Sequence, residues 1–238
     1  SIVNVTESSI ARNSDWVLPI HAGPEIGVAS TKAFLGQMLV LYILCLKISY
    51  LRNDLNKKSY QNKIKNLNKL PTLLKKVLET EDKIQIIAKD FLKAKGSMFL
   101  GRGSSFPIAL EGALKLKELS YLHAEGYPAG EMKHGPLALI ENGLPVIIIA
   151  PEDKYFEKTL SNMQEVIARG GKVLLVTDVK KELLNENIRF GLRVPFIENS
   201  LSPFLLTIPL QLLAYHVALL KNCDIDKPRN LAKSVTVE

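Results

Sequence analysis

The sequence predicts an α/β fold in which parallel strands are covered by helices on both faces. The fully apolar run Val146–Ala150 and the apolar run Val173–Thr177 alternate with segments of helical periodicity, a pattern typical of buried parallel strands. A strand–loop–helix pattern also occurs near both ends of the chain, from Trp16 to Tyr50 and from Leu192 to Lys221. The two occurrences share no strict residue match. They indicate two tandem units of one α/β fold, of which the first lacks its front half.

The first unit combines short strands with one long apolar helix. Ile2–Val5 and Trp16–Ile20 are short apolar runs, so we expect strands there. Thr31–Tyr50 is expected to be a helix, and its apolar core of about 15 residues is shorter than the roughly 20 that a membrane span needs. We therefore expect a buried helix. Asn53–Glu79 then shows apolar residues at three- or four-residue spacing, which predicts an amphipathic helical connector with a break at Pro71.

The second unit begins near Glu81 and alternates helices with apolar strands. A glycine turn, Gly101–Ser105, opens one helix, and Gly170 with Gly171 provides a C-cap for a later one. A loop rich in proline and glycine is expected over Ala124–Gly135. In chain order, the expected elements are a helix at Asp82–Lys95, a strand at Ser97–Leu100, a helix at Pro107–Leu122, a strand at Val146–Ala150, a helix at Phe156–Arg169, strands at Val173–Thr177 and Leu192–Ile197, and a helix at Pro203–Lys221.

Composition and charge exclude several classes of protein. The chain is 47% hydrophobic and 23% charged, which is ordinary globular composition and excludes a disordered, collagenous or disulfide-scaffold chain. The formal net charge of +7 comes mostly from seven lysines between Lys57 and Lys76. Tyr60 is the only aromatic residue in that run, so a solvated helix face is favoured over a nucleic-acid site, which stays the least favoured alternative. Cys45 and Cys223 form no metal or redox spacing, which favours a reduced cytosolic protein.

One helix carries a possible acid–base group. Glu111, Lys115 and Glu118 lie at spacings of four and three residues, so they share one helix face. Spacing alone favours an exposed ladder of ion pairs. The alternative is an enolisation base, Glu118, beside the ammonium group of Lys115, because a carboxylate near a carbonyl compound can move a proton between adjacent carbons.

Two further titratable residues lie in loop or tail segments. His134, in the loop Tyr127–Pro136, could act as an acid or base near neutral pH, or it could simply cap backbone carbonyls. Lys233, in the polar tail, could meet a carbonyl carbon if the tail docks in a cleft; otherwise the tail is a disordered terminus. His216 lies on an apolar helix and is expected to be a satisfied core residue. No histidine has metal-ligand spacing to a cysteine or carboxylate cluster, so we expect no metal site.

Four separated motifs, in order, resemble the glucosamine-6-phosphate synthase family, also called glutamine–fructose-6-phosphate aminotransferase (isomerizing). They are His21–Phe34, Ala109–Glu118, Glu131–Ala138 and Pro228–Glu238, and together the resemblance covers essentially the whole chain. The resemblance implies the C-terminal isomerase half of that family. This half consists of two tandem sugar isomerase (SIS) domains, each a doubly wound parallel sheet with helices on both faces.

The resemblance also implies roles for individual residues. Lys233 would contact or react with the sugar carbonyl, and Glu118 would move the proton between C1 and C2. His134 would assist ring opening and would be supplied by the partner subunit of a homodimer. The implied substrate-binding residues are Val28, Ala29, Ser30, Lys115 and Ala232.

The implied reaction makes glucosamine 6-phosphate, a precursor of UDP-N-acetylglucosamine, from fructose 6-phosphate and glutamine-derived ammonia. An imine forms at C2, and a 1,2 proton shift follows. The resemblance implies no metal or organic cofactor, a glutaminase domain in the full-length protein, and a location in the cytoplasm. It implies no nucleic-acid or membrane partner.

The expected organisation follows from the same resemblance. We expect the C-terminal part of a first SIS domain over residues 1–52, a helical connector over 53–80, a second SIS domain over 81–222 and an active-site tail over 223–238. The family's glutaminase domain and its Ser/Thr-rich phosphate loops are not in this sequence, so a chain truncated at its N-terminus is expected. The alternative is a non-catalytic SIS module that binds a sugar phosphate as a regulator. Such a module would not need Glu118, His134 and Lys233 together, so their co-occurrence favours the enzyme.

Overall fold

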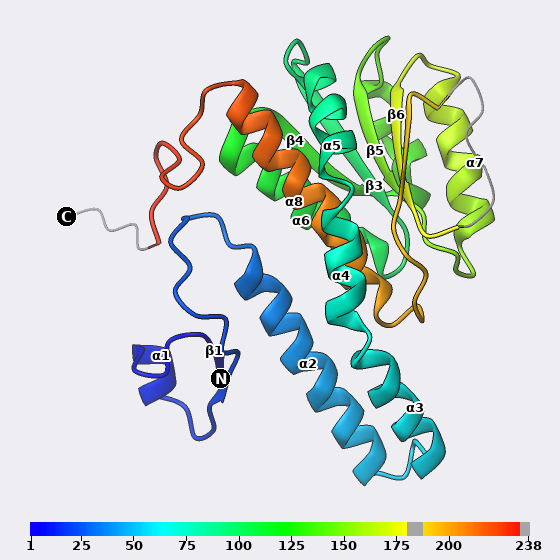
Figure 1. Cartoon of the computed structure of the whole chain (residues 1–238). Helices are drawn as coiled ribbons and strands as arrows, with labels where there is room; N and C mark the ends of the chain where they lie inside the picture. Colours follow the sequence, from blue (N-terminus) through cyan, green and yellow to red (C-terminus); the bar gives the residue numbers. More distant parts are fainter. Residues whose placement is uncertain (180–187, 234–238) are drawn as a thin grey trace. The chain divides into compact units, whose positions relative to one another are not determined.

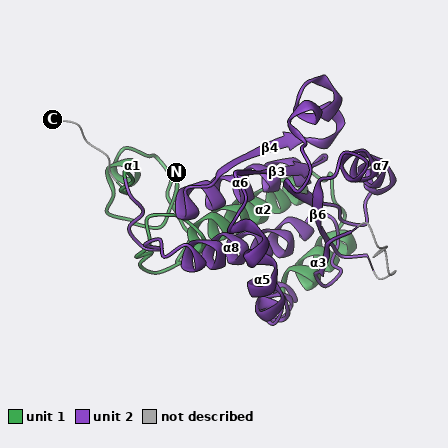
Figure 2. Cartoon of the chain, turned by 90° about the horizontal axis from the view of Figure 1, so that it is seen from above, with its two compact units in different colours: residues 1–68, 230–238 green, residues 69–229 purple. Residues whose placement is uncertain are grey.

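The computed structural model describes residues 1–179 and 188–233, and the chain separates into two compact units (Figure 2). Unit 1 consists of Ser1–Asn68 together with the residues from Asn230 onward, and unit 2 consists of Lys69–Arg229. The boundary after Asn68 falls inside the segment 53–80 that is expected as a connector.

Unit 1 contains two very short strands and one long helix. β1 (Ile2–Val3) and β2 (Leu18–Pro19) pair in parallel, and α1 (Ser9–Arg12) lies between them in the chain. Both strands lie inside the ranges expected for them, although each is only two residues long. α2 (Lys32–Leu51) and α3 (Lys57–Leu67) follow.

α2 is apolar over most of its length but buries little of it. Leu46 is the only residue of α2 that is buried among the described parts of the chain. By length and composition alone, α2 and α8 (Ser202–Leu220) could each cross a membrane, but the apolar window of α8 is 61% buried and that of α2 is 6% buried. The expectation of a buried helix is wrong for α2, because its main packing partners in unit 1 are the small elements β1 and α3.

Unit 2 is organised around one five-stranded sheet in which all neighbouring strands run parallel. The spatial order is β4–β3–β5–β6–β7, so the chain adds β4 on one side of β3 and the later strands on the other. The strands are β3 (Gly96–Gly101), β4 (His123–Pro128), β5 (Pro145–Ile149), β6 (Lys172–Thr177) and β7 (Phe190–Arg193). Every residue of β5 is buried, as the apolar runs predict.

Helices cover both faces of this sheet, which confirms the predicted fold class (Figure 1). α6 and α8 pack closely on each other and on one face, while α7 and the 3₁₀ helix η2 cover the other. The remaining helices of unit 2 lie beside α8, and η3 follows η2. The bounds are α4 (Leu70–Leu78), α5 (Glu81–Ala88), η1 (Lys89–Phe91), α6 (Ser105–Ser120), η2 (Ala129–His134), η3 (Pro136–Leu139) and α7 (Phe156–Ile167).

Four sequence-based boundaries are wrong. The helix expected over Asp82–Lys95 ends earlier, since α5 ends at Ala88 and the 3₁₀ helix η1 at Phe91. Ala124–Gly135, expected as a loop, contains the edge strand β4 and the helix η2, because pairing with β3 can hold an edge strand that has no apolar run and is mostly half-exposed. The last strand ends at Arg193 and not at Ile197. The break in the connector precedes Pro71: α3 ends at Leu67, and the proline lies in the first turn of α4, where its missing N–H is not needed.

Candidate active site

Three charged residues on α6 form a cluster in unit 2. The Lys115 ammonium nitrogen lies 2.7 Å from Glu118 Oε2 and 3.6 Å from Glu111 Oε1. The Lys115 side chain is 3% exposed and that of Glu118 is 22% exposed, and Glu111 is buried as well. The expected ladder of exposed ion pairs is therefore wrong, because this face of α6 points into the unit. A buried cation beside a carboxylate that solvent still reaches is an arrangement suited to acid–base chemistry.

Two glycines set the position of this cluster: Gly101 at the turn before α6, and Gly112 within α6. A Cβ added at Gly101 would lie 2.2 Å from the carbonyl oxygen of Ser105, so the turn between β3 and α6 closes only around glycine. At Gly112, a Cβ would lie 2.7 Å from Leu210 Cδ1 and 2.9 Å from Phe99 Cε1. α6 therefore packs tightly against both α8 and β3, which holds the charged face in place.

Glu111 has a strongly perturbed acidity. Burial raises its pKa from 4.5 to about 6, the charge of Lys115 opposes this rise, and the charge of Glu118 adds to it. Glu111 Oε1 is buried and has no hydrogen-bond partner within the described part of the chain. Sequence reasoning placed Glu111 on the right helix face but did not select it as a site residue, since spacing carries no information on burial.

His134 closes η2 and is open to solvent. Its side chain is 78% exposed, and its Nε2 lies 3.9 Å from the carboxylate of Glu131, one turn earlier. Unit 2 thus places His134 at a surface, with its imidazole available to groups outside its own loop.

Unit 1 brings the tail lysine to the loop before α2. The Lys233 ammonium group donates a hydrogen bond to the backbone carbonyl oxygen of Glu25. The same loop continues through Val28, Ala29 and Ser30, of which Ala29 is buried and the other two are half-buried. Four of the sequence-predicted residues therefore share one part of unit 1. Ala232 is exposed beside Lys233.

Glu25 organises this loop, and sequence reasoning missed it. Its Oε1 accepts hydrogen bonds from the N–H groups of Thr31, at 2.9 Å, and Ala33, at 3.2 Å, and so it caps the start of α2. Burial raises the pKa of Glu25, but these N–H groups, the Ser30 hydroxyl and the charge of Lys233 together hold it below its usual value. An acid shortly before a helix start was the signal that could have identified it.

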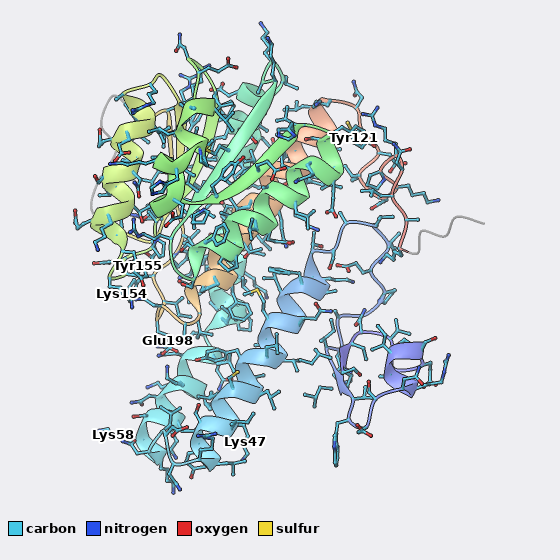
Figure 3. The ribbon with its side chains drawn as sticks, turned by 180° about the vertical axis from the view of Figure 1, so that it is seen from behind. Lys47, Lys58, Tyr121, Lys154, Tyr155 and Glu198 are labelled. Atoms are coloured by element: carbon cyan, nitrogen blue, oxygen red, sulfur yellow. The ribbon has the colours of Figure 1, made fainter. Side chains whose placement is uncertain are left out.

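The start of the tail is attached to unit 2 by one tyrosine. Tyr121, labelled in Figure 3 at the C-terminal end of α6, has φ = 59° and lies in the left-handed region. Its hydroxyl accepts a hydrogen bond of 2.8 Å from the backbone N–H of Arg229. The Arg229 guanidinium carbon lies 4.2 Å from the centre of the tyrosine ring.

No group of three or more His, Cys, Asp or Glu side chains that could hold a metal ion occurs among residues 1–179 and 188–233. Cys45 is exposed and Cys223 is half-buried, and both are free thiols.

The SIS domain family matches this chain over residues 90–221. A Bartonella quintana protein named glutamine–fructose-6-phosphate aminotransferase (isomerizing) is 51% identical over 239 residues, covering 100% of this chain and 39% of that protein. A protein of the same name from Rhizobium meliloti is 50% identical over 240 residues, again over 100% of this chain. The chain thus spans only 39–40% of the length of these curated relatives.

Two solved structures are similar as well. The C-terminal domain of glucosamine-fructose-6-phosphate aminotransferase from Francisella tularensis superposes with a TM-score of 0.92 at 45% identity, covering 95% of this chain and 64% of that one. Glucosamine-6-phosphate deaminase from Thermotoga maritima superposes with a TM-score of 0.75 at 27% identity, covering 99% and 66%.

Proposed function

Because the chain belongs to the SIS domain family, we propose that it carries the isomerising part of glucosamine 6-phosphate synthesis. The observation that supports this most strongly is the 51% identity, over the whole of this chain, to a protein named glutamine–fructose-6-phosphate aminotransferase (isomerizing). The buried Lys115–Glu118 pair supplies a carboxylate base of the kind that such a reaction needs.

In the proposed reaction, ammonia adds to the C2 carbonyl of fructose 6-phosphate, and water leaves as the imine forms. Glu118 then takes a proton from C1 while the imine nitrogen gains one, which gives an enolamine. A proton is returned to C2 as the C1 hydroxyl loses its own proton, so that C1 becomes the aldehyde of glucosamine 6-phosphate and the nitrogen its amine. Lys115, held against Glu118, offsets negative charge that develops on the sugar oxygens during this shift. No metal or organic cofactor takes part in the proposed steps.

The remaining roles belong to residues that lie in loops and in the tail. We assign Lys233 to the sugar carbonyl, which its position beside the loop Glu25–Ser30 supports. We assign His134 to ring opening in the partner subunit of a homodimer, which its exposed imidazole supports. The proposed substrate-binding residues are Val28, Ala29, Ser30, Lys115 and Ala232.

The proposal extends to the organisation of the whole protein. We assign residues 1–52 to the C-terminal part of a first SIS domain, 53–80 to a connector, 81–222 to the second SIS domain and 223–238 to an active-site tail. A glutaminase domain would supply ammonia from glutamine in the longer protein, and the location would be the cytoplasm. The greater length of the curated relatives supports this arrangement.

The test is proton exchange at C1 of fructose 6-phosphate. The chain is incubated with the sugar phosphate in D₂O, and deuterium incorporation at C1 is followed by NMR, which requires the base but no ammonia. Exchange should be lost in Glu118→Gln and kept in Glu125→Gln, because Glu125 forms only a half-exposed ion pair with Lys117. Exchange that survives Glu118→Gln would contradict the assignment of the base. Binding of the sugar phosphate without exchange in the unsubstituted chain would instead indicate a binding module.

A further inference from the structure

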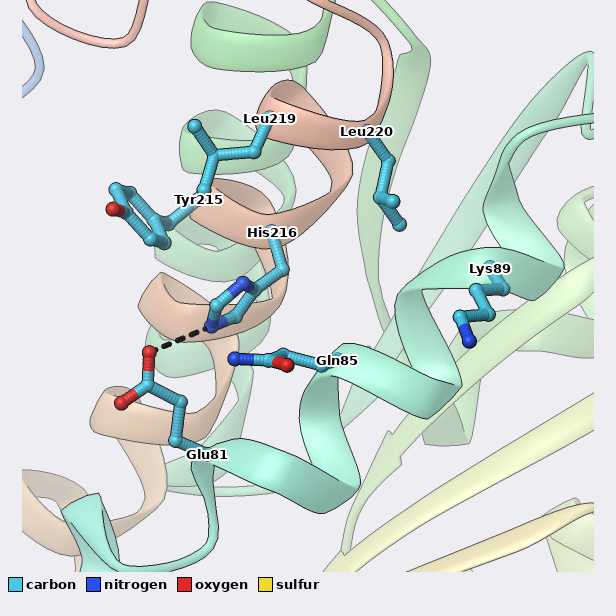
Figure 4. A pocket seen from close by; sticks show the side chains of 7 residues that line it. All are labelled: Glu81, Gln85, Lys89, Tyr215, His216, Leu219 and Leu220. Atoms are coloured by element: carbon cyan, nitrogen blue, oxygen red, sulfur yellow. Dashed lines mark hydrogen bonds and ion pairs between the residues drawn. The ribbon is translucent and has the colours of Figure 1, made fainter.

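A groove in unit 2, outside the cluster on α6, lies between α5 and α8. It has a volume of about 420 Å³, within the range of roughly 300–1,000 Å³ that is usual for small-molecule sites. Figure 4 shows the side chains that line it, which come from α5 and η1 on one side and from the last turns of α8 on the other. They are Glu81, Gln85, Lys89, Tyr215, His216, Leu219 and Leu220.

The polar wall of this groove carries opposite charges at its two ends. Glu81, Gln85 and Lys89 follow one another at four-residue spacing, so carboxylate, amide and ammonium groups occur in that order along one helical face. Over eight helical residues the backbone rises by about 12 Å, so the backbone positions of Glu81 and Lys89 lie about two turns apart. A ligand that lies along this wall therefore meets an anion at one end and a cation at the other.

The carboxylate end is pre-organised by a buried histidine. His216 Nε2 lies 3.0 Å from Glu81 Oε1, and the side chain of His216 is 7% exposed whereas that of Glu81 is 47% exposed (Figure 4). The imidazole thus holds one carboxylate oxygen and leaves the group partly open to the groove. This burial confirms the expectation that His216 is a satisfied core residue.

The opposite wall, on α8, carries two apolar residues that are not fully covered. Leu219 and Leu220, at the end of α8, are 42% and 39% exposed although both line the groove. An apolar surface facing a row of three polar groups is the usual composition of a metabolite site. The carbon skeleton of a ligand would cover these leucines.

We propose that the groove between α5 and α8 binds a small zwitterionic metabolite, whose amine pairs with Glu81 and whose phosphate or carboxylate pairs with Lys89. Two small molecules of the proposed reaction carry both an amine and an acidic group. The choice of these two as probes rests on the proposed function. An amino-sugar phosphate, glucosamine 6-phosphate, would make the groove a product-sensing site. An amino acid, glutamine, would make it a site that senses the nitrogen donor.

The experiment is a titration of the full chain followed by amide ¹H–¹⁵N NMR, because shifted amides identify the site that is occupied. Glucosamine 6-phosphate and glutamine are the two probes, and fructose 6-phosphate, which has no amine, is the control. We expect at least one zwitterion to shift the amides of Gln85, Lys89, Leu219 and Leu220 with a dissociation constant of about 1 mM or lower. Fructose 6-phosphate should leave these amides unchanged.

Lys89→Gln is the variant of choice because Lys89 is exposed and its replacement should not disturb folding. It should weaken zwitterion binding about tenfold or more, the effect of losing one charge-assisted hydrogen bond. Lys83→Gln is the matched control, since Lys83 is an exposed lysine of α5 that does not line the groove.

The proposal is overturned if neither zwitterion shifts the groove amides, in which case the Glu81–His216 pair only fastens α5 to α8. It is also overturned if binding is the same in the Lys89→Gln and Lys83→Gln variants, or if fructose 6-phosphate shifts the same amides. Failure of the proposed function would look different, as a lack of shifts around Lys115 and Glu118 with fructose 6-phosphate.

Discussion

The ammonium nitrogen of Lys115 lies 2.7 Å from a carboxylate oxygen of Glu118 one turn further along α6. The lysine side chain is only 3% exposed. A lysine in such surroundings needs its carboxylate partners, because an isolated buried charge is costly. The reverse also holds, since Glu111 and Glu118 both depend on this one cation for compensation nearby.

Removal of the cation should therefore destabilise the unit. We expect Lys115→Met to lower the free energy of unfolding by about 3 kcal/mol, because it leaves buried carboxylates without their partner. The matched control is Lys117→Met on the same helix, whose ion pair with Glu125 is 41% exposed on both sides. The control should cost less than about 1 kcal/mol. Urea unfolding of both variants measures the free energy of unfolding. Equal losses in the two variants would show that the buried ion pair stabilises the unit no more than the exposed one does.

Glu111 should make stability depend on pH. The folded chain raises the pKa of Glu111 from 4.5 to about 6, so the folded state binds this proton more tightly than the unfolded state does. This tighter proton binding stabilises the folded state. Its contribution to the free energy of unfolding is fully present below pH 4.5 and is lost as the pH rises through 6.

The Glu111→Gln variant should lack this loss. Relative to the variant, the unsubstituted chain should lose about 2 kcal/mol of stability between about pH 4 and pH 7.5. Denaturant unfolding at several pH values measures the difference, with Glu125→Gln as the control carboxylate. Parallel curves for the Glu111 variant and the unsubstituted chain would contradict the raised pKa.

The turn between β3 and α6 should not tolerate a side chain at Gly101. A Cβ there would lie 2.2 Å from the Ser105 carbonyl oxygen, a backbone atom that cannot rotate away. We expect Gly101→Ala to cost about 3 kcal/mol, at the upper end of overpacking effects. Gly96→Ala is the milder control at the other end of β3, since its Cβ would lie 3.2 Å from the His123 carbonyl oxygen. A thermal unfolding series ranks the two, and a larger loss for Gly96→Ala would refute the argument.

Tyr121 should hold the beginning of the C-terminal tail. Tyr121→Phe removes the hydroxyl that accepts the 2.8 Å hydrogen bond from the Arg229 N–H, although the ring that contacts the guanidinium remains. We expect faster tryptic cleavage after Arg229, because local opening of this segment becomes easier. Tyr127→Phe is the control variant. An unchanged cleavage rate at this site would show that the hydrogen bond does not restrain the tail.

Much of unit 2 could be predicted because its signals are local. β5 and β6 are continuous apolar runs, and Gly170 ends the helix before β6 with φ = 81°. β4 could not be predicted in this way: it has no apolar run and is mostly half-exposed, and it is a strand only because β3 offers a free edge to pair with.

The candidate site divides in the same manner. Glu118, Lys115 and their shared helix face follow from spacing, whereas the burial of Lys115 and the raised pKa of Glu111 do not. Glu25 was missed because its role depends on hydrogen bonds to Thr31 and Ala33, which exist only once α2 has formed behind the loop.

The sequence by itself determined the α/β class, the order of most elements and the resemblance carried by four motifs, because periodicity, glycine turns and motif spacing are properties of short stretches of chain. The tertiary structure decided which charges are buried, that β4 is a strand and that His216 meets Glu81, 135 residues away. Burial and pairing depend on contacts between residues far apart in the chain, and those contacts set the free energy of a charge or a hydrogen-bonding group.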